Sequence, residues 1–116
     1  MPGPGRPFFD SDGDNTAQAI IAKAGELYAL EVSNPNNVDG YIQLFDLATG
    51  DVTVGATTPK QSFLAPAGDG TQEGGMDKFW PNGMVFDTAI TYACTTTATG
   101  GTALSTGLVV NALVSK

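Results

Sequence analysis

ELYALEVSNPNNVDGYIQLFD, residues 26–46, is the stretch that decides the fold. In both of its arms, apolar and other side chains alternate with a period of two, as they do in β-strands. Between the arms lie residues that favour turns through fixed φ angles, side-chain hydrogen bonds or tolerance of positive φ: Asn34, Pro35, Asn36, Asn37, Asp39 and Gly40. The stretch therefore predicts a β-hairpin at the centre of a sheet, with strands at Glu26–Ser33 and Gly40–Leu47.

The rest of the chain is also strand-like. Further strands are predicted at 19–23, 52–54, 60–65, 76–80, 84–87, 89–95 and 106–115. Pro81-Asn82-Gly83 predicts a hairpin turn between 76–80 and 84–87. Glycine-rich residues 66–75 and 96–102 predict exposed loops. Because no window shows a 3.6-residue apolar period, little helix is expected.

These short strands, at roughly ten-residue spacing and separated by Gly, Pro and Asn, predict an all-β fold. A chain of 116 residues is the size of one domain. We therefore expect a single-domain β-sandwich or jelly-roll-like fold over residues 16–116. Residues 1–15, which are rich in Pro and Gly and then acidic, are predicted to form an extended N-terminal arm.

The predicted arm begins with MPGPGRP, residues 1–7. Its prolines remove backbone donors and its glycines add conformational freedom, so neither a helix nor a ladder strand is expected. Our hypothesis is that residues 1–9 dock on a neighbouring copy or a partner protein; the alternative is that they lie on their own domain. The candidate partner-binding residues are Pro2, Pro4, Arg6, Pro7, Phe8 and Phe9.

Asp10, Asp12 and Asp14 have the alternate-residue spacing of the first oxygen ligands in calcium loops. An EF-hand loop also requires glycine at its sixth position and glutamate at its twelfth. Counting from Asp10, those positions hold Asn15 and Ile21. The mismatch favours a solvated acidic linker over a calcium site, and the sequence indicates no other metal and no cofactor.

The charge balance disfavours nucleic acid as a partner. Twelve acidic residues against five basic ones give a formal net charge of −7, and the bases are scattered along the chain. Phosphate backbones are bound by clustered Lys and Arg. With no apolar run of 18 residues and no recognisable signal peptide, we also expect no membrane partner and no export signal.

Catalytic chemistry is not indicated. The chain contains no histidine, which removes the commonest general base, the usual zinc ligand and any Ser-His-Asp arrangement. The single Cys94 lies inside a predicted strand, where a buried apolar role is favoured over a reactive thiol. A lone cysteine also suits a reducing compartment. We expect a protein that is not an enzyme.

Phe79 and Trp80 form the most prominent aromatic group. They could anchor an interface or stack on a sugar, although a single tryptophan in a small domain more often belongs to the core. A carbohydrate-binding module would need an exposed flat platform formed by Trp80, Tyr41 and Tyr92. Burial of these three rings would argue against it.

LYALEVSNPNNVDGYIQLFDLATGDVTVGATTPKQSFLA, residues 27–65, and residues 84–114, which contain FDTAITYACTTTATGGTALSTGLVV, resemble small structural proteins of tailed bacteriophages. The resemblance covers about two-thirds of the chain and rests on strands and turns, so no functional residue is carried over. It implies a non-enzymatic β-domain used in many copies in a virion.

The resemblance leads us to expect a capsid decoration (cement) protein, which binds the outer surface of a phage head and stabilises it. The implied partners are the major capsid protein and further copies of the chain, in a homodimer or homotrimer. The implied location is the capsid surface, after synthesis in the host cytoplasm. The alternatives are a tail or baseplate accessory protein, whose loops at 66–75 and 95–102 meet the host surface, and a carbohydrate-binding β-sandwich module.

Overall fold

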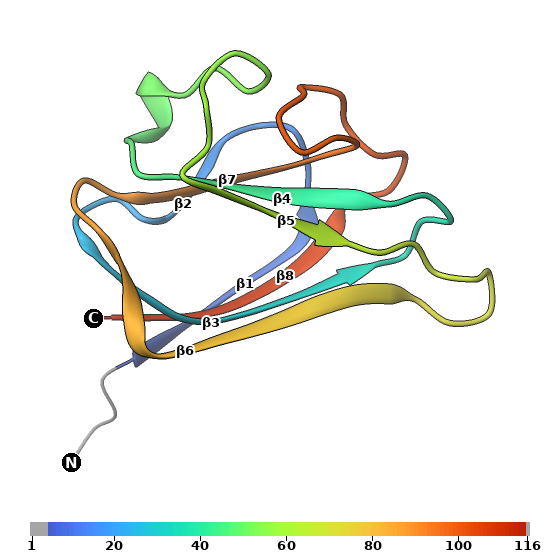
Figure 1. The fold of residues 1–116 in the computed structure, drawn as a ribbon, viewed down its shortest axis with the longest axis horizontal. Coiled ribbons are helices and arrows are strands. Elements are labelled where there is room, and N and C mark those ends of the chain that lie inside the picture. Colours follow the sequence, from blue (N-terminus) through green and yellow to red (C-terminus); the bar gives the residue numbers. More distant parts are fainter. Residues whose placement is uncertain (1–4, 116) are drawn as a thin grey trace.

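The computed structural model describes residues 5–115, which form two four-stranded antiparallel sheets packed face to face (Figure 1). The strands are β1 (Gly5–Gly13), β2 (Gln18–Ile21), β3 (Gly25–Asn34), β4 (Gly40–Phe45), β5 (Gln61–Ala65), β6 (Gly74–Phe86), β7 (Ile90–Thr95) and β8 (Leu108–Ser115). The helix in this part of the chain is one short 3-10 turn, η1 (Thr49–Asp51). The prediction of an all-β sandwich with little helix is confirmed.

The topology is that of a jelly roll. The first sheet has the order β1-β8-β3-β6 and the second has the order β2-β7-β4-β5. Strand β1 pairs with β8, β2 with β7, β3 with β6 and β4 with β5, as if one long hairpin had been rolled up. Pairing of β3 with β8 and of β4 with β7 completes the sheets.

The predicted hairpin at residues 26–46 is wrong, although its strands are placed nearly correctly. Strand β3 belongs to the first sheet and β4 to the second, so the connection between them crosses from one sheet to the other (Figure 1). A strand with alternating apolar residues meets the core equally well in either arrangement. The turn residues themselves distinguish the two, because Asn34 and Asn36 are buried, whereas the tip of a hairpin is normally exposed.

These two asparagines hold the corner of the sandwich together. The Nδ2 atom of Asn34 donates to the carbonyls of Val38 and Ala65, at 3.0 and 2.9 Å. Asn36 donates from Nδ2 to the carbonyl of Thr106 and accepts at Oδ1 from the Thr106 N–H. Asn34 Oδ1 in turn accepts from both the backbone N–H and Nδ2 of Asn36. The β3–β4 connection is thereby tied to the end of β5 and to the β7–β8 connection.

Residues 5–13, which were assigned to the N-terminal arm, form the edge strand β1. Its register on β8 runs from Gly5 opposite Ser115 to Gly13 opposite Leu108. The expectation that residues 1–7 form no ladder strand is wrong for residues 5–7, because an edge strand tolerates a proline such as Pro7. A boundary at residue 15 therefore does not separate the described part of the arm from the sandwich. Pro2 and Pro4 lie outside the described residues.

The predicted turn at Pro81-Asn82-Gly83 is instead a bulge within one long strand. Strand β6 runs from Gly74 to Phe86 and pairs with β3 on both sides of residues 80–83. Opposite the step from Leu27 to Ala29, β6 runs from Met84 back to Phe79, so its extra residues loop out. The strand predicted at 52–54 is also wrong, since turns follow η1 there.

The core lies between the sheets. In β8, Leu108, Val110, Ala112 and Val114 are buried and their neighbours are half-buried, as the alternation predicted. All residues of β7 are buried, because the connections after β4 and after β7 lie over the outer side of the second sheet (Figure 1). Gln43 anchors one of these connections, with Nε2 donating to the carbonyl of Gly100 at 2.9 Å.

Asp46, directly after β4, organises the turn between β6 and β7. Its carboxylate accepts the backbone N–H groups of Asp87, Thr88 and Ala89. Partial burial raises the pKa of Asp46, but these donors and the charge of Lys60 outweigh it, so the pKa lies below its ordinary value. The ionised carboxylate is thus part of the folded structure.

Candidate functional site: the outer face of the first sheet

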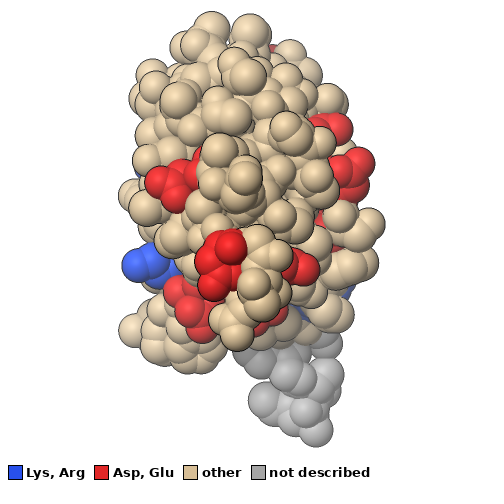
Figure 2. All heavy atoms as spheres, turned by 90° about the vertical axis from the view of Figure 1, so that its right-hand side faces the viewer, with Lys and Arg blue, Asp and Glu red and all other residues tan. Residues whose placement is uncertain are grey.

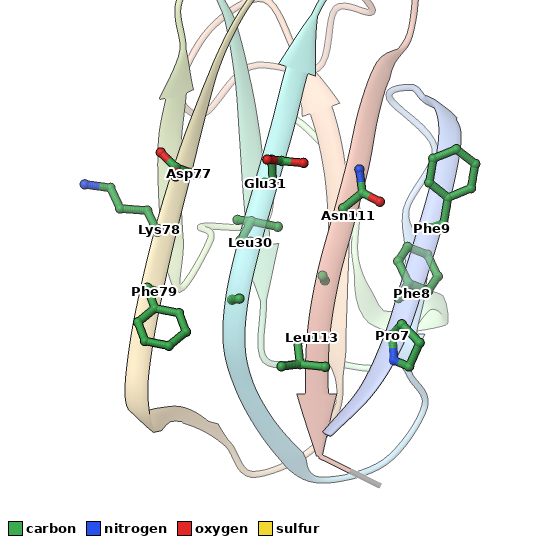
Figure 3. Close-up of a pocket in the computed structure, with 12 residues that line it drawn as sticks. Pro7, Phe8, Phe9, Leu30, Glu31, Asp77, Lys78, Phe79, Asn111 and Leu113 are labelled. Carbon is green, nitrogen blue, oxygen red and sulfur yellow. The ribbon is translucent and has the colours of Figure 1, made fainter. Parts of the chain in front are cut away.

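The outer face of the first sheet carries an open groove of about 610 Å³. The strand register places its outward-facing side chains in two rows that cross all four strands. The first row is Phe9, Asn111, Glu31 and Asp77, and the second is Pro7, Leu113, Ala29 and Phe79. We call these eight residues the docking face. Figure 3 shows its labelled side chains projecting from the sheet.

Two phenylalanines stand at opposite margins of the docking face. Phe9 on β1 is 64% exposed and Phe79 on β6 is 71% exposed, the highest values among the large apolar side chains of residues 5–115. Ala29 and Leu113 lie between them, half-buried. Exposed aromatic side chains at the margins of a partly apolar groove are typical of interaction surfaces.

The structure divides each aromatic pair that the sequence singled out. Phe8 turns inward, where its ring packs edge-to-face on Tyr92 with centroids 5.7 Å apart. Trp80 is half-buried and packs on Phe63, also at 5.7 Å. Their neighbours Phe9 and Phe79 point outward and share one face. Sequence reasoning treated each pair as a unit, but strand alternation alone sends adjacent side chains to opposite faces.

The polar residues of the docking face are acidic or neutral. Glu31 lies opposite Asp77 on one side and opposite Asn111 on the other. Lys78 lines the margin of the groove, but its ammonium group lies 5.9 Å from the ring centroid of Phe63 and points away from the docking face (Figure 3). The two rows thus contain two carboxylates and no basic side chain.

Two of the three candidate calcium ligands, Asp10 and Asp14, accept hydrogen bonds within the chain, and Asp12 takes part through its backbone N–H. Asp10 accepts the Tyr92 O–H at Oδ2 and the Asp12 N–H at Oδ1. Asp14 Oδ1 accepts the Thr16 N–H at 2.9 Å. Within residues 5–115, no three His, Cys, Asp or Glu side chains are grouped so that they could hold a metal ion.

The three rings proposed as a sugar platform do not lie together. Tyr92 is buried in the core, where desolvation and its bond to Asp10 raise the pKa of its hydroxyl. Tyr41 is half-buried on β4, where it lies opposite Thr95 and is one residue out of phase with the core residue Ile42. It therefore faces away from Tyr92, and Trp80 packs on Phe63.

Cys94 is a buried free thiol. Burial, followed by the nearby carboxylates of Asp10 and Asp14, raises the pKa of this thiol to about 12. At neutral pH it is protonated and behaves as a small apolar side chain, as predicted.

The end of the molecule that carries the β3–β4 and β5–β6 connections is rich in acidic side chains (Figure 2). Asp39 accepts the Ala67 N–H and thus links the two connections. Asp69 accepts the N–H groups of Gln72 and Thr71, which lower its pKa. These carboxylates organise their own loops.

No helix in the part of the chain that the structure describes is long and apolar enough to cross a membrane. In comparisons with known proteins, the chain matches no family model and no curated sequence.

Proposed function

We propose that this chain is a decoration (cement) protein of a phage head, which attaches to the outer surface of the shell and stabilises it. The observation that carries the proposal is the docking face, with Phe9 and Phe79 exposed at its margins. The resemblance of residues 27–65 and 84–114 to small structural proteins of tailed phages supplies the setting.

Such a role requires stable attachment to another protein and no catalysis. Stable protein interfaces bury roughly 800 Å² on each partner, usually around a few aromatic anchors. An uncovered sheet face with two exposed rings suits this requirement. Jelly rolls occur among capsid proteins and lectins alike, so the fold agrees with the proposal by analogy and does not select it.

The contribution of the N-terminal segment is narrower in this proposal than the sequence suggested. Phe8 serves the core of its own domain, whereas Arg6, Pro7 and Phe9 are exposed on β1. We propose that contact with the major capsid protein uses Pro7 and Phe9 together with Phe79, whereas Arg6 is out of phase with the docking face. Further contacts between copies of the chain would form the dimer or trimer.

Co-sedimentation with phage heads that lack the chain tests the proposal. Deleting residues 1–9 would remove half of β1, so point variants are better probes. We expect saturable binding that weakens at least tenfold in Phe9→Ser and in Phe79→Ser. Val38→Ser is the matched control, because Val38 is 53% exposed but lies in the β3–β4 connection, away from the docking face.

Binding to isolated tails in place of heads would favour the alternative role as a tail or baseplate accessory protein. Binding to neither would refute a virion role at this surface.

A further inference from the structure

We infer that the docking face binds a partner protein that presents apolar side chains to Phe9 and Phe79 and an arginine or lysine to Glu31 and Asp77. The inference deepens the proposed function and relies on it only for the phage head as the source of that partner. It is carried by the arrangement of charge and exposed rings across the four strands.

The central carboxylates of the docking face need a cation when the face is covered. Glu31 and Asp77 are direct cross-strand neighbours, so their Cβ atoms lie about 5 Å apart. In water their repulsion is screened, but an interface that covers them removes that screening. Covering two adjacent carboxylates without a counter-charge is strongly unfavourable.

The chain does not supply that cation itself. Lys78, which lies between Asp77 and Phe79 in sequence, is paired with the core residue Leu30 and extends toward Phe63. Arg6 is paired with Val114, another core residue, so it too is out of phase with the outward-facing rows. The positive charge must therefore come from the molecule that covers the docking face.

A second copy of the chain is a poor occupant for the same reason. If two docking faces met, Glu31 and Asp77 of both copies would enter one desolvated layer, and neither face would contribute a basic side chain. The net charge of −7 adds repulsion between copies at longer range. The charge pattern thus selects a basic partner over self-association at this face.

The spacing of the anchors indicates the pattern of the partner. Phe9 and Phe79 lie on the two edge strands of a four-stranded sheet, about 14 Å apart, and in adjacent rows, about 7 Å apart along the strands, so about 16 Å separates their positions. In an extended segment, the first and fifth side chains point the same way and lie about 14 Å apart, at roughly 3.4 Å per residue, which brings them within reach of the two rings. The third side chain also points that way and lies near Glu31, so an apolar-x-basic-x-apolar pattern would match the two rings and the neighbouring carboxylates.

Two synthetic peptides test this chemistry without phage heads. The probes are acetylated Leu-Thr-Arg-Thr-Leu amide and the same peptide with Glu in place of Arg, each titrated into ¹⁵N-labelled full chain. With the Arg peptide we expect amide shifts centred on Ala29, Glu31, Asp77 and Asn111, and with the Glu peptide at least tenfold weaker binding. Equal binding of both peptides, binding elsewhere on the chain, or no binding at millimolar concentration would overturn the inference.

The variant Glu31→Gln/Asp77→Asn isolates the contribution of charge. It should weaken binding of the Arg peptide about tenfold and remove most of its salt dependence. Asp51→Asn/Glu73→Gln is the matched control, because both of its residues are exposed and lie outside the docking face. Unchanged melting temperatures would show that both double variants remain folded.

Comparison with the head-binding assay separates the two proposals. Head binding that is unaffected by Glu31→Gln/Asp77→Asn would sustain the proposed function and overturn this inference. Charge-dependent peptide binding without head binding would sustain this inference and overturn the proposed function. A dimer seen in sedimentation velocity that dissociates on Phe79→Ser would identify a second copy as the occupant and would also overturn the inference.

Discussion

Replacing Asn34 with alanine should be one of the most destabilising single changes outside the apolar core. Asn34 is fully buried and its side chain makes four hydrogen bonds, of 2.9 to 3.0 Å, to Val38, Ala65 and Asn36. At about 1 kcal/mol for each bond, the loss is about 4 kcal/mol. Since Val38 is exposed and its carbonyl can be rehydrated, about 3 kcal/mol is the lower end of the expected range.

This loss should be large in thermal unfolding. For 116 residues the unfolding entropy is about 0.24 kcal/mol/K, so a loss of 3–4 kcal/mol lowers the melting temperature by about 12–16 °C. Urea unfolding followed by circular dichroism would give the free energy directly, with Asn37→Ala, an exposed position in the same connection, as the control. A loss below 1 kcal/mol would refute the view that this side chain holds the corner.

A double-mutant cycle with Asn36→Ala sharpens the test. The two side chains share the bond from Asn36 Nδ2 to Asn34 Oδ1. This bond is lost in either single variant and is therefore counted twice when the two losses are added. The summed loss of unfolding free energy in the two single variants should exceed the loss in the double variant by about 1 kcal/mol. Strict additivity would mean that the bond contributes nothing.

Other parts of the structure give three further predictions. Tyr92→Phe, which loses the hydrogen bond to Asp10, should lower the free energy of unfolding by about 2 kcal/mol in urea titrations. Because the pKa of Asp46 is lowered in the folded state, its ionised carboxylate stabilises the fold fully above the ordinary pKa of 3.8, and this stabilisation is lost as the pH falls through the lower pKa of the folded state. Asp46→Asn should therefore flatten the acid side of a curve of unfolding free energy against pH. Cys94 should resist thiol reagents at pH 8 until urea unfolds the chain, and rapid labelling of the native protein would contradict its burial.

The sequence was sufficient to predict the fold class and most strands, because those depend on local patterns. The alternation of apolar residues in β8, and the glycines and prolines that separate the segments, correctly predicted the strands of a sandwich. The partners of each strand were not predictable in this way. A polar connection such as residues 35–39 joins two strands equally well within one sheet or between two sheets. The burial of Asn34 and Asn36 distinguishes a connection between the sheets from a hairpin within one sheet. This burial depends on Ala65 and Thr106, which are distant in sequence.

The candidate site was only half predictable for a related reason. Their positions beside the N-terminal arm and beside Trp80 singled out Phe9 and Phe79, but these two residues lie 70 residues apart in the chain. They share a face because β1 and β6 are the two edges of one sheet, with β8 and β3 between them. That order is a property of the complete jelly roll. Glu31 and Asp77 were missed altogether, since isolated carboxylates on strands are common and only the register makes them neighbours.

The two sheets differ in what covers their outer sides, and this difference favours the first sheet for the proposed contact with a partner. Over the second sheet, the loops after β4 and β7 bury Gln43 and Thr95, which hydrogen-bond to each other at 2.7 Å. Over the first sheet, the strands of the docking face alternate between core residues and outward-facing ones, and the largest exposed rings stand at its edges. A jelly roll needs only one face of each sheet for its core. The chain's own loops already cover the outer face of the second sheet. A broad contact with a partner is therefore best accommodated by the outer face of the first sheet.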